Sequence, residues 1–467
     1  MKSVIFFFAA AWLGVIFYQQ AKPLPDGLSV VGALRPSSEV RFVYDLTFER
    51  DGGKVSEQMI FEEICRLVDG AQHFVLLDFF LFNGLHDPRQ PFPPLAEALT
   101  SRIITKRQRA PQVDIVLITD EINRQYGSHE FEHLQRLRQA GVRVIYTDLS
   151  RLRDSNFFYS AWWRLCCQWL GSEGAGWLFS PFATGGPRLS LRGYLNLMNF
   201  KANHRKVAMN EGEALIASAN PHDASALHSN IGVLVRGEVL RDIVVAETAV
   251  AAMSGQTIPS FAPLSAPAGE NPVQVQLLTE GGIKRRILEA INGCGPGDRV
   301  DLAMFYLSDR QVINALLAAA GRGAVVRLVL DPNREAFGRA KNGIPNRPVA
   351  AELTKRSNGA IRVRWYRTRG EQFHSKLILV AAKERLLLVG GSANLTGRNL
   401  NDLNVEADLA VLASMDAPVA SQAMEYFQRI WENRGGVYTD DFGVWQDASS
   451  TRYWLYRFQE WSGMSTF

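Results

Sequence analysis

Cysteine is scarce in this chain, and its charge is close to balanced. The four cysteines among 467 residues form no C-x-x-C pair and show no metal-ligand spacing, so we expect buried or lipid-facing thiols and neither a metal nor another cofactor. A formal net charge of +4 is too small to indicate nucleic acid as a partner. Hydrophobic residues at 47% and charged residues at 21% argue against disorder and fit a globular protein with a bias toward membranes.

Long apolar runs are also missing, apart from one at the N-terminus. The uncharged run from Val4 to Tyr18 is shorter than the ~20 residues that span a bilayer comfortably, and it is close to the core of a signal peptide. Because Gln19 stands where a cleavage site needs a small residue, we expect residues 1–22 to stay as a membrane anchor instead of being removed as a signal. Lys2 on the inner side would place the rest of the chain outside the cytoplasm.

The chain does contain one short motif twice. A His-x-Lys tripeptide is followed each time by Ser-Ala-Asn, in His204-Arg-Lys206 with Ser218-Ala-Asn220 and in His374-Ser-Lys376 with Ser392-Ala-Asn394. A histidine, a lysine, a serine and an asparagine supplied twice can surround one tetrahedral phosphate. The alternative is two unrelated tripeptides on ordinary strands, but it leaves the ordered similarity of the two halves unexplained.

Both halves of the chain follow a β-α-β-α-β pattern. The matching apolar strands are Phe74–Leu81 with Val300–Leu307, Val113–Asp120 with Ala324–Asp331, and Gly141–Tyr146 with Ala360–Trp365. Stretches of helical period lie between them, such as Glu130–Ala140 and Asp309–Ala320. We therefore expect an α/β fold of two duplicated domains with mixed, largely parallel sheets flanked by helices.

A proline-rich segment, residues 254–272, is typical of an interdomain linker. It predicts a first domain at residues 38–253 and a second at 273–436. Measured between matching landmarks, the first half carries about 40 extra residues, which we assign to an insertion at 150–198.

Aromatic and arginine side chains are concentrated in that insertion and in the C-terminal segment, residues 437–467. Such mixtures suit the headgroup boundary of a bilayer. An ordinary aromatic cluster covering the domain is the alternative. Neither segment can be a transmembrane helix, because charges or Gly and Ser interrupt both.

The paired motif suits phosphodiester chemistry. Such a site must neutralise the anion, supply a nucleophile and provide a proton for the departing alkoxide. Lys206 and Lys376 can neutralise the nonbridging oxygens, which the serines and asparagines of both motifs can hydrogen-bond. One imidazole can attack phosphorus while the other donates the proton, and no metal is needed.

These residues resemble the signature of the phospholipase D superfamily, HxKx4Dx6GSxN, which occurs twice in two-domain members. The resemblance covers Glu57–Arg434 and is closest to bacterial cardiolipin synthases and related phosphatidyltransferases at Gly390–Gly397 and Leu403–Glu406. It implies two phospholipase D-like domains that form one pseudo-two-fold active site, with a phosphohistidine intermediate. It also implies a phospholipid substrate such as phosphatidylglycerol and a place in the bacterial inner membrane, with the periplasmic face favoured.

The chain departs from this signature in a few places. Glu211 and Ala381 occupy the aspartate position, and Ala217 replaces the first glycine of the first copy. The family aspartate acts mainly in structural support, so these changes affect packing more than chemistry. The distance from histidine to serine also differs between the copies, which fits a hairpin of variable length.

The resemblance also implies individual roles. His204 would be the nucleophile and His374 the general acid/base, and Glu406 matches an acidic position that orients an active-site histidine. Asn230 is the equivalent of Glu406 in the first half, so the two imidazoles would have unequal partners. Other polar residues are open to structural interpretations: Asp78, Asp301, His222, His228 and the basic loop Asp331–Asn342, which could also bind a second headgroup.

Three functions remain compatible with the sequence. The first is membrane-associated phosphatidyl transfer to a lipid alcohol, of the cardiolipin synthase type. The second is phospholipase D hydrolysis, in which water replaces the alcohol. The third is a nuclease of the same superfamily, against which stand the small net charge and the N-terminal apolar run. The sequence leaves the acceptor and the oligomeric state open.

Overall fold

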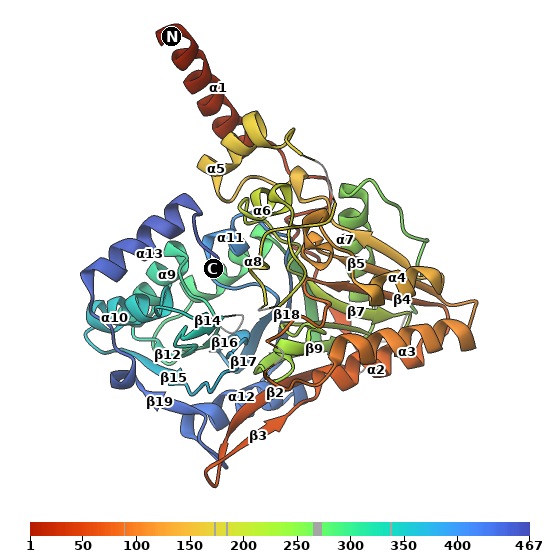
Figure 1. Cartoon of the computed structure of the whole chain (residues 1–467). Coiled ribbons are helices and arrows are strands. Elements are labelled where there is room, and N and C mark those ends of the chain that lie inside the picture. The colour runs from red at the N-terminus through yellow and green to blue at the C-terminus, as the bar shows by residue number, and fades with distance from the viewer. Residues whose placement is uncertain (88, 172–173, 184, 265–272, 337–338) are drawn as a thin grey trace.

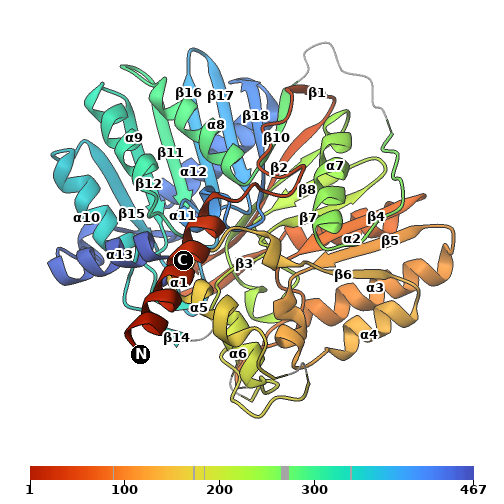
Figure 2. The ribbon, with the colours of Figure 1, turned by 90° about the horizontal axis from the view of Figure 1, so that it is seen from above.

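Two large β-sheets dominate the structure (Figures 1 and 2). The computed structural model describes residues 1–87, 89–171, 174–183, 185–264, 273–336 and 339–467. In spatial order the first sheet consists of β3 (Gly53–Glu57), β2 (Val40–Arg50), β9 (Asn230–Val235), β8 (Ala214–Ala217), β7 (Lys206–Asn210), β4 (Phe74–Phe79), β5 (Asp114–Thr119) and β6 (Arg143–Tyr146). The second consists of β1 (Arg35–Ser37), β10 (Val273–Thr279), β18 (Ala407–Ser414), β17 (Arg385–Gly391), β16 (Lys376–Ala382), β11 (Arg299–Met304), β12 (Val325–Leu330), β15 (Ile361–Tyr366) and β19 (Thr439–Asp441).

The two sheets repeat one topology. The order from β2 through β9, β8, β7, β4 and β5 to β6 matches, strand for strand, the order from β10 through β18, β17, β16, β11 and β12 to β15. Each half is therefore a copy of the same α/β unit, which confirms the duplication expected from the sequence. The limits of the two domains stay a prediction, and residues 265–272 of the expected linker lie outside the described residues.

Parallel pairing occurs where a helix connects the strands. β4–β5, β5–β6, β11–β12 and β12–β15 are parallel, whereas the other neighbouring pairs within these two sheets, over the residues described, are antiparallel. The expectation of largely parallel sheets is therefore wrong, although the mixed α/β class is confirmed. The reason is that each motif strand turns back through a hairpin, and a hairpin makes antiparallel neighbours.

Helices cover the outer faces of both sheets. On the first sheet these are α2 (Ile60–Gly70), α3 (Leu95–Arg109) and α4 (Glu132–Gln139), and on the second α8 (Gly281–Asn292), α9 (Arg310–Gly321) and α10 (Asn346–Arg356). Figure 2 shows α3 and α4 on the opposite side of the molecule from α9 and α10. The remaining helices are α1 (Lys2–Ala21), α5 (Phe157–Trp162), α6 (Leu191–Leu197), α7 (Val239–Met253), α11 (Gly397–Leu400), α12 (Pro418–Glu432) and α13 (Ser450–Ser462).

A single hydrophobic core joins the two halves. It combines buried residues of α7 and α12 with the inner faces of strands from both sheets. Gly390 on β17 permits this close approach, because a Cβ added there would lie 3.0 Å from Cδ1 of Ile231 on β9. At the rim, the guanidinium of Arg429 forms two hydrogen bonds of 2.8 Å with the carboxylate of Glu57. The halves are thus packed as one body around a shared interior.

Helix α1 projects from the rest of the molecule beside α5 (Figure 1). By length and composition it could cross a membrane, as a signal sequence also could, and no other helix of the described ranges passes the same test. The helix spans 20 residues and is longer than the apolar run from which the anchor was expected. Trp12 stacks on Phe158 of α5 and donates to its carbonyl at 3.2 Å.

Candidate active site

The two His-x-Lys motifs come from opposite halves of the chain and occupy equivalent positions in the two sheets. The lysine of each motif is the first residue of a strand, β7 or β16. The residue just before each histidine forms a β-bridge with the other half of the chain. Asn203 forms a parallel bridge with Val405, and Phe373 forms the equivalent bridge with Ser229. Because these bridges fix the backbone on both sides, the two histidines lie at the interface between the sheets.

Each histidine is hydrogen-bonded to a residue of the other half. Nδ1 of His204 lies 3.0 Å from Oε2 of Glu406, and Nδ1 of His374 lies 3.2 Å from Oδ1 of Asn230. An oxygen acceptor makes Nδ1 the protonated nitrogen in both rings and leaves Nε2 for chemistry. Glu406 and Asn230 are therefore equivalent, as expected from the sequence, and each contacts the histidine of the half to which it does not belong.

The two serines support these partners. The hydroxyl of Ser392 donates to Oε2 of Glu406 and accepts from the backbone N–H of Ala407 at 3.0 Å. In the other half, Ser218 donates to Oδ1 of Asn230 at 3.1 Å and accepts from Ile231. Both hydroxyls thus hold the residue that orients an imidazole, Glu406 or Asn230. The spacing of the motifs does not predict these hydrogen bonds.

The lysines and asparagines of both motifs are buried beside the histidines. Lys206 donates to the carbonyl of His204, and Lys376 donates to the carbonyl of His374 at 2.9 Å. Asn220 accepts the N–H of Leu81 through Oδ1 at 3.1 Å, whereas Oδ1 of Asn394 is buried without a partner among the described residues. The structure therefore brings the histidine, lysine and serine of each motif together around Glu406 and Asn230, and it buries both asparagines.

Two aromatic residues of the site were missed by the sequence-based prediction. Phe80 packs edge-on against His204 and lies under the ammonium of Lys206, with centroid distances of 5.2 and 5.3 Å. Phe305 lies in the same way against His374 and Lys376, at 4.9 and 5.1 Å. Both lie within the matched segments and directly follow β4 or β11, so aligning the repeats residue by residue would have revealed them.

Burial and like charge keep the imidazoles neutral. Burial lowers the pKa of His204 to about 4, although Glu406 opposes this shift. Burial, together with Lys376 and His228, lowers the pKa of His374 well below its usual value. Lys206 and His204 also act on His374, so the two motifs are close enough to interact electrostatically.

The lysines are affected in the same way. Burial lowers the pKa of Lys206 to about 7, and burial with the charge of Lys206 lowers the pKa of Lys376 well below its usual value. Glu406 opposes both shifts. An anion placed among these groups would raise all four pKa values, so binding and protonation are coupled.

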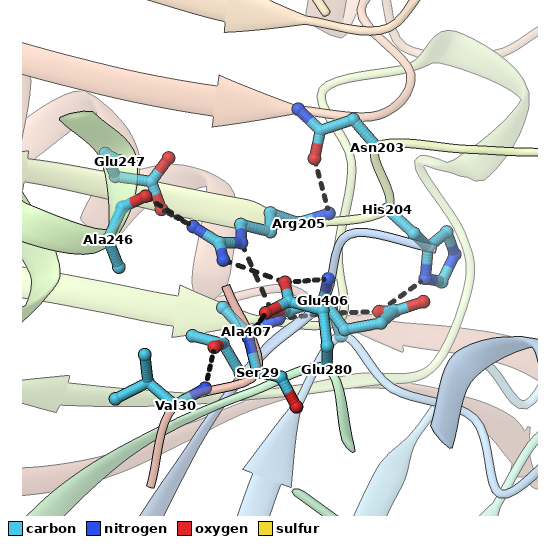
Figure 3. A network of polar contacts seen from close by, with 12 residues as sticks. Ser29, Val30, Asn203, His204, Arg205, Ala246, Glu247, Glu280, Glu406 and Ala407 are labelled. Atoms are coloured by element: carbon cyan, nitrogen blue, oxygen red, sulfur yellow. Dashed lines mark hydrogen bonds and ion pairs between the residues drawn. The ribbon is translucent and has the colours of Figure 1, made fainter. Parts of the chain in front are cut away.

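A buried network behind the site holds Glu406 in place (Figure 3). Arg205 donates to the backbone carbonyl of Glu406 at 3.2 Å and to Oε1 of Glu280 at 2.9 Å. The same Glu280 oxygen accepts the backbone N–H of Glu406 at 3.0 Å. Arg205 also forms an ion pair with Glu247 at 3.1 Å. The residue between the motif's histidine and lysine thus fixes the backbone of the residue that orients that histidine.

The acidic residues that the sequence left open act as supports. Asp78 accepts the amide of Asn203 at 2.7 Å, and Asp301 pairs with Arg327 at 2.7 Å. Glu211, at the family's aspartate position, accepts the backbone N–H groups of residues 72–74. Its role is therefore to hold the turn that leads into β4.

The two further histidines behave differently. His222 is satisfied by Ser225 and by the carbonyl of Leu85, each at 2.9 Å. His228 is buried edge-on to His374 at 5.9 Å, and its Nδ1 has no partner among the described residues. Within the same part of the chain, no three His, Cys, Asp or Glu side chains form a group that could hold a metal ion.

Known proteins share this fold. Residues 287–431 match a family model described as "Cardiolipin synthase, PLD-like domain". The crystal structure of phosphatidylserine synthase from Haemophilus influenzae Rd KW20 is similar with a TM-score of 0.58 and 11% identity, over 98% of each chain. At that identity the likeness concerns the fold alone. A search of curated proteins finds no match to the sequence.

Two other structures are similar at TM-scores too low to support an argument. A polyphosphate kinase from Porphyromonas gingivalis aligns with a TM-score of 0.48 and 13% identity, over 91% of this chain and 54% of that chain. The phospholipase D family member Nuc from Salmonella typhimurium aligns with a TM-score of 0.27 and 20% identity, over 35% of this chain and 97% of that chain.

The family match defines the class of the second half: residues 287–431 match a domain of the phospholipase D superfamily, and the first half repeats the same strand topology. Within that superfamily, residues 287–431 are a phospholipase D-like domain of the cardiolipin synthase family.

Proposed function

We propose that the protein is a membrane-associated phosphatidyltransferase of the cardiolipin synthase type. The observation that carries this proposal is the pair of buried imidazoles, His204 and His374, each hydrogen-bonded through Nδ1 to a residue of the opposite half. Two imidazoles with different partners can divide the roles of nucleophile and acid between them. The domain family matched by residues 287–431 supports the choice of a phospholipid substrate.

In the first step, Nε2 of His204 attacks phosphorus of a phosphatidylglycerol-like donor. A P–N bond forms, the P–O bond to the headgroup alcohol breaks, and protonated His374 transfers its proton to the departing oxygen. The neutral state of His204 and its contact with Glu406 support its assignment as nucleophile. Lys206, Lys376 and the amides of Asn220 and Asn394 are the proposed ligands of the nonbridging oxygens.

In the second step the roles reverse. His374 removes the proton of an alcohol on a second lipid, the alkoxide oxygen attacks phosphorus, and the P–N bond breaks to release His204. The low pKa of His374 in the free protein means that the proton for the first step must arrive together with the anionic substrate. Binding of the anionic substrate would thus favour the protonated form of His374, which is the acid of the first step.

A membrane location agrees with the exposed aromatic side chains of the insertion and of α13. Trp162, Trp169, Trp177 and Phe179 of the insertion are exposed, as is Trp461 of α13. Trp461 packs on Phe158, the residue that also stacks on Trp12 of α1. We infer that α1 anchors the protein and that these aromatic residues rest at the headgroup level, with the catalytic domains on the periplasmic face.

The decisive experiment is incubation of purified protein with labelled phosphatidylglycerol, followed by lipid chromatography. Cardiolipin is the expected product, and it should be absent with His204→Ala or His374→Ala. Formation of phosphatidic acid without cardiolipin would show that the protein hydrolyses the lipid and does not transfer its phosphatidyl group. Full activity of the His374→Ala variant would contradict the two-histidine mechanism.

A further inference from the structure

A cavity at the loop that follows β12, in the same half of the chain as His374, has the properties of an anion site. It has a volume of about 470 Å³ and is lined by Arg334, Glu335, Lys341, Arg347 and Trp445, with Gln90 contributed by the first half. Three of these side chains are cationic and one is a carboxylate. The cavity therefore carries an excess of positive charge without belonging to either His-x-Lys motif.

The two arginines are held in position before any ligand arrives. Their guanidinium carbons lie 4.8 Å (Arg334) and 4.5 Å (Arg347) from the ring centroid of Trp445. Arg334 also donates to the carbonyl of Thr368 at 3.3 Å, and Arg347 to that of Pro332 at 2.8 Å. Stacking and a backbone acceptor together limit the rotamers that these long side chains can adopt.

Neither guanidinium is neutralised by a carboxylate among the residues that the structure describes. The nearby Asp447 forms its ion pair with Arg452 instead. Burial and then the charges of Arg452 and Arg334 lower the pKa of Arg347, whereas Asp447 and Asp331 oppose the shift. Two preorganised, half-buried cations that form no ion pair with a described carboxylate are a typical binding site for a phosphate group.

The cavity is tied directly to the catalytic strand. The carbonyl of Glu335 accepts a hydrogen bond from Gln372 at 3.2 Å, two residues before His374. Asp331 accepts the backbone N–H of Phe373 at 2.8 Å and that of Asn333, which precedes Arg334, at 2.6 Å. The loop after β12 therefore links Arg334, and through the carbonyl of Pro332 also Arg347 of α10, to the segment that precedes His374.

We propose that this cavity binds the phosphate group of the second substrate and so places its alcohol next to His374. The proposal rests on the phosphatidyl transfer proposed above and names the recognition element for its acceptor. The ligand is a phosphate ester, which could come from a phospholipid headgroup or from a soluble phosphate. Arg334 and Arg347 bind its oxygens, and Trp445 keeps both guanidinium groups in place.

The test uses the full chain in detergent and the fluorescence of Trp445, assigned by difference from Trp445→Phe. Inorganic phosphate and dihexanoyl phosphatidylglycerol are titrated separately into wild type and into the Arg334→Gln/Arg347→Gln double variant. Arg457→Gln is the matched control, because Arg457 also stacks on an aromatic ring, that of Tyr453 at 5.8 Å, but lies outside the cavity. We expect saturable binding in wild type and control, weakened about tenfold or more in the double variant.

Binding of both probes, or of either one, with this dependence supports a phosphate site, and the probe that binds identifies the source. Absence of binding, or equal binding to the double variant, overturns the proposal. The labelled-lipid assay with wild type separates this result from the proposed function. Cardiolipin formation without phosphate binding refutes the cavity alone, whereas phosphate binding without lipid turnover refutes the transferase alone.

Discussion

Glu406 and Asn230 occupy equivalent positions in the two halves but differ in charge. Glu406 counteracts the effect of burial on His204, whereas the neutral Asn230 leaves His374 without such compensation. Despite burial, His204 and Lys206 lower the pKa of Glu406, so the carboxylate stays ionised beside the imidazole. This difference in one side chain is what makes the two imidazoles of a symmetric site unequal.

Replacing Glu406 by Gln removes the charge that raises the pKa of His204. The pKa should fall below about 4, so the acid limb of kcat/KM should move to lower pH. Turnover should also fall by about 10² to 10⁴, because the neutral amide no longer stabilises the positive charge that His204 gains as the P–N bond forms. The measurement is a pH–rate profile on labelled phosphatidylglycerol.

Asn230→Asp is the matched change in the other half. It adds a carboxylate next to His374 and should raise its pKa, so the basic limb should move to higher pH. An acid limb that does not move in Glu406→Gln, or a basic limb that does not move in Asn230→Asp, would contradict the assigned contacts.

Anion binding should take up protons. Burial lowers the pKa of Lys206 to about 7, and a bound anion raises it, so affinity should be highest below pH 7 and fall as the pH rises through the pKa of the complex. Sulfate is a suitable probe because its own charge is constant over this range. Calorimetry in buffers of different ionisation enthalpy should detect proton uptake near pH 8, and its absence there would contradict a neutral Lys206.

The residues of the two motifs could be predicted from the sequence, because the same residue types recur in the same order in both halves. The crossing of their partners could not be predicted, since Glu406 lies 32 residues after His374 and yet contacts His204. Sequence distance carries no information on which of two symmetry-related rings a side chain reaches. The same holds for Arg205, whose partners Glu247 and Glu280 come from distant segments.

At the scale of elements, the hairpin that carries each motif differs in length between the two copies of the duplicated unit. β7 and β8 have five and four residues, whereas β16 and β17 have seven each. The unequal spacing from histidine to serine therefore comes mainly from the length of the strands. The sequence predicted the helices between the strands well, because their apolar period is strong, but it could not give the direction of strands joined by hairpins.

Glu211→Ala tests the support of the β7 hairpin. Loss of the carboxylate leaves the backbone N–H groups of residues 72–74 without their acceptor, which should lower the free energy of unfolding by about 1–3 kcal/mol. Urea denaturation measures the change, and the exposed Glu62, replaced by Ala on the adjoining α2, should change it by at most about 0.5 kcal/mol. Equal stability of both variants would show that the turn does not need this side chain.

For the whole molecule, α1 packs beside α5 of the insertion, and the insertion carries several exposed aromatic residues. The insertion was expected to suit either a bilayer or an ordinary aromatic cluster, and the structure contains both kinds of residue. Ala161 and Trp163 are buried, whereas Trp169, Trp177 and Phe179 remain exposed. Hydropathy alone could not separate these groups, because burial depends on which side of a short helix contacts the domain.

A protein lacking residues 1–21 should still bind anionic vesicles weakly through these side chains. Trp169→Ser together with Trp177→Ser should remove most of that binding with little change in stability, because both side chains are exposed. Vesicle flotation measures it, with Val245→Ser on α7 as an exposed apolar control. Equal flotation of the tryptophan variant and the control would exclude these residues from the membrane surface.

The crossed hydrogen bonds also limit how such a gene can evolve. Each repeat supplies the hydrogen bond that orients the catalytic imidazole of the other repeat. Neither copy can therefore accumulate mutations while the other alone keeps the activity. Damage to one copy disables both, and a chimaera assembled from two homologues would work only if the acidic and amide positions arrived as a compatible set. Fusion into one polypeptide keeps that set inherited together.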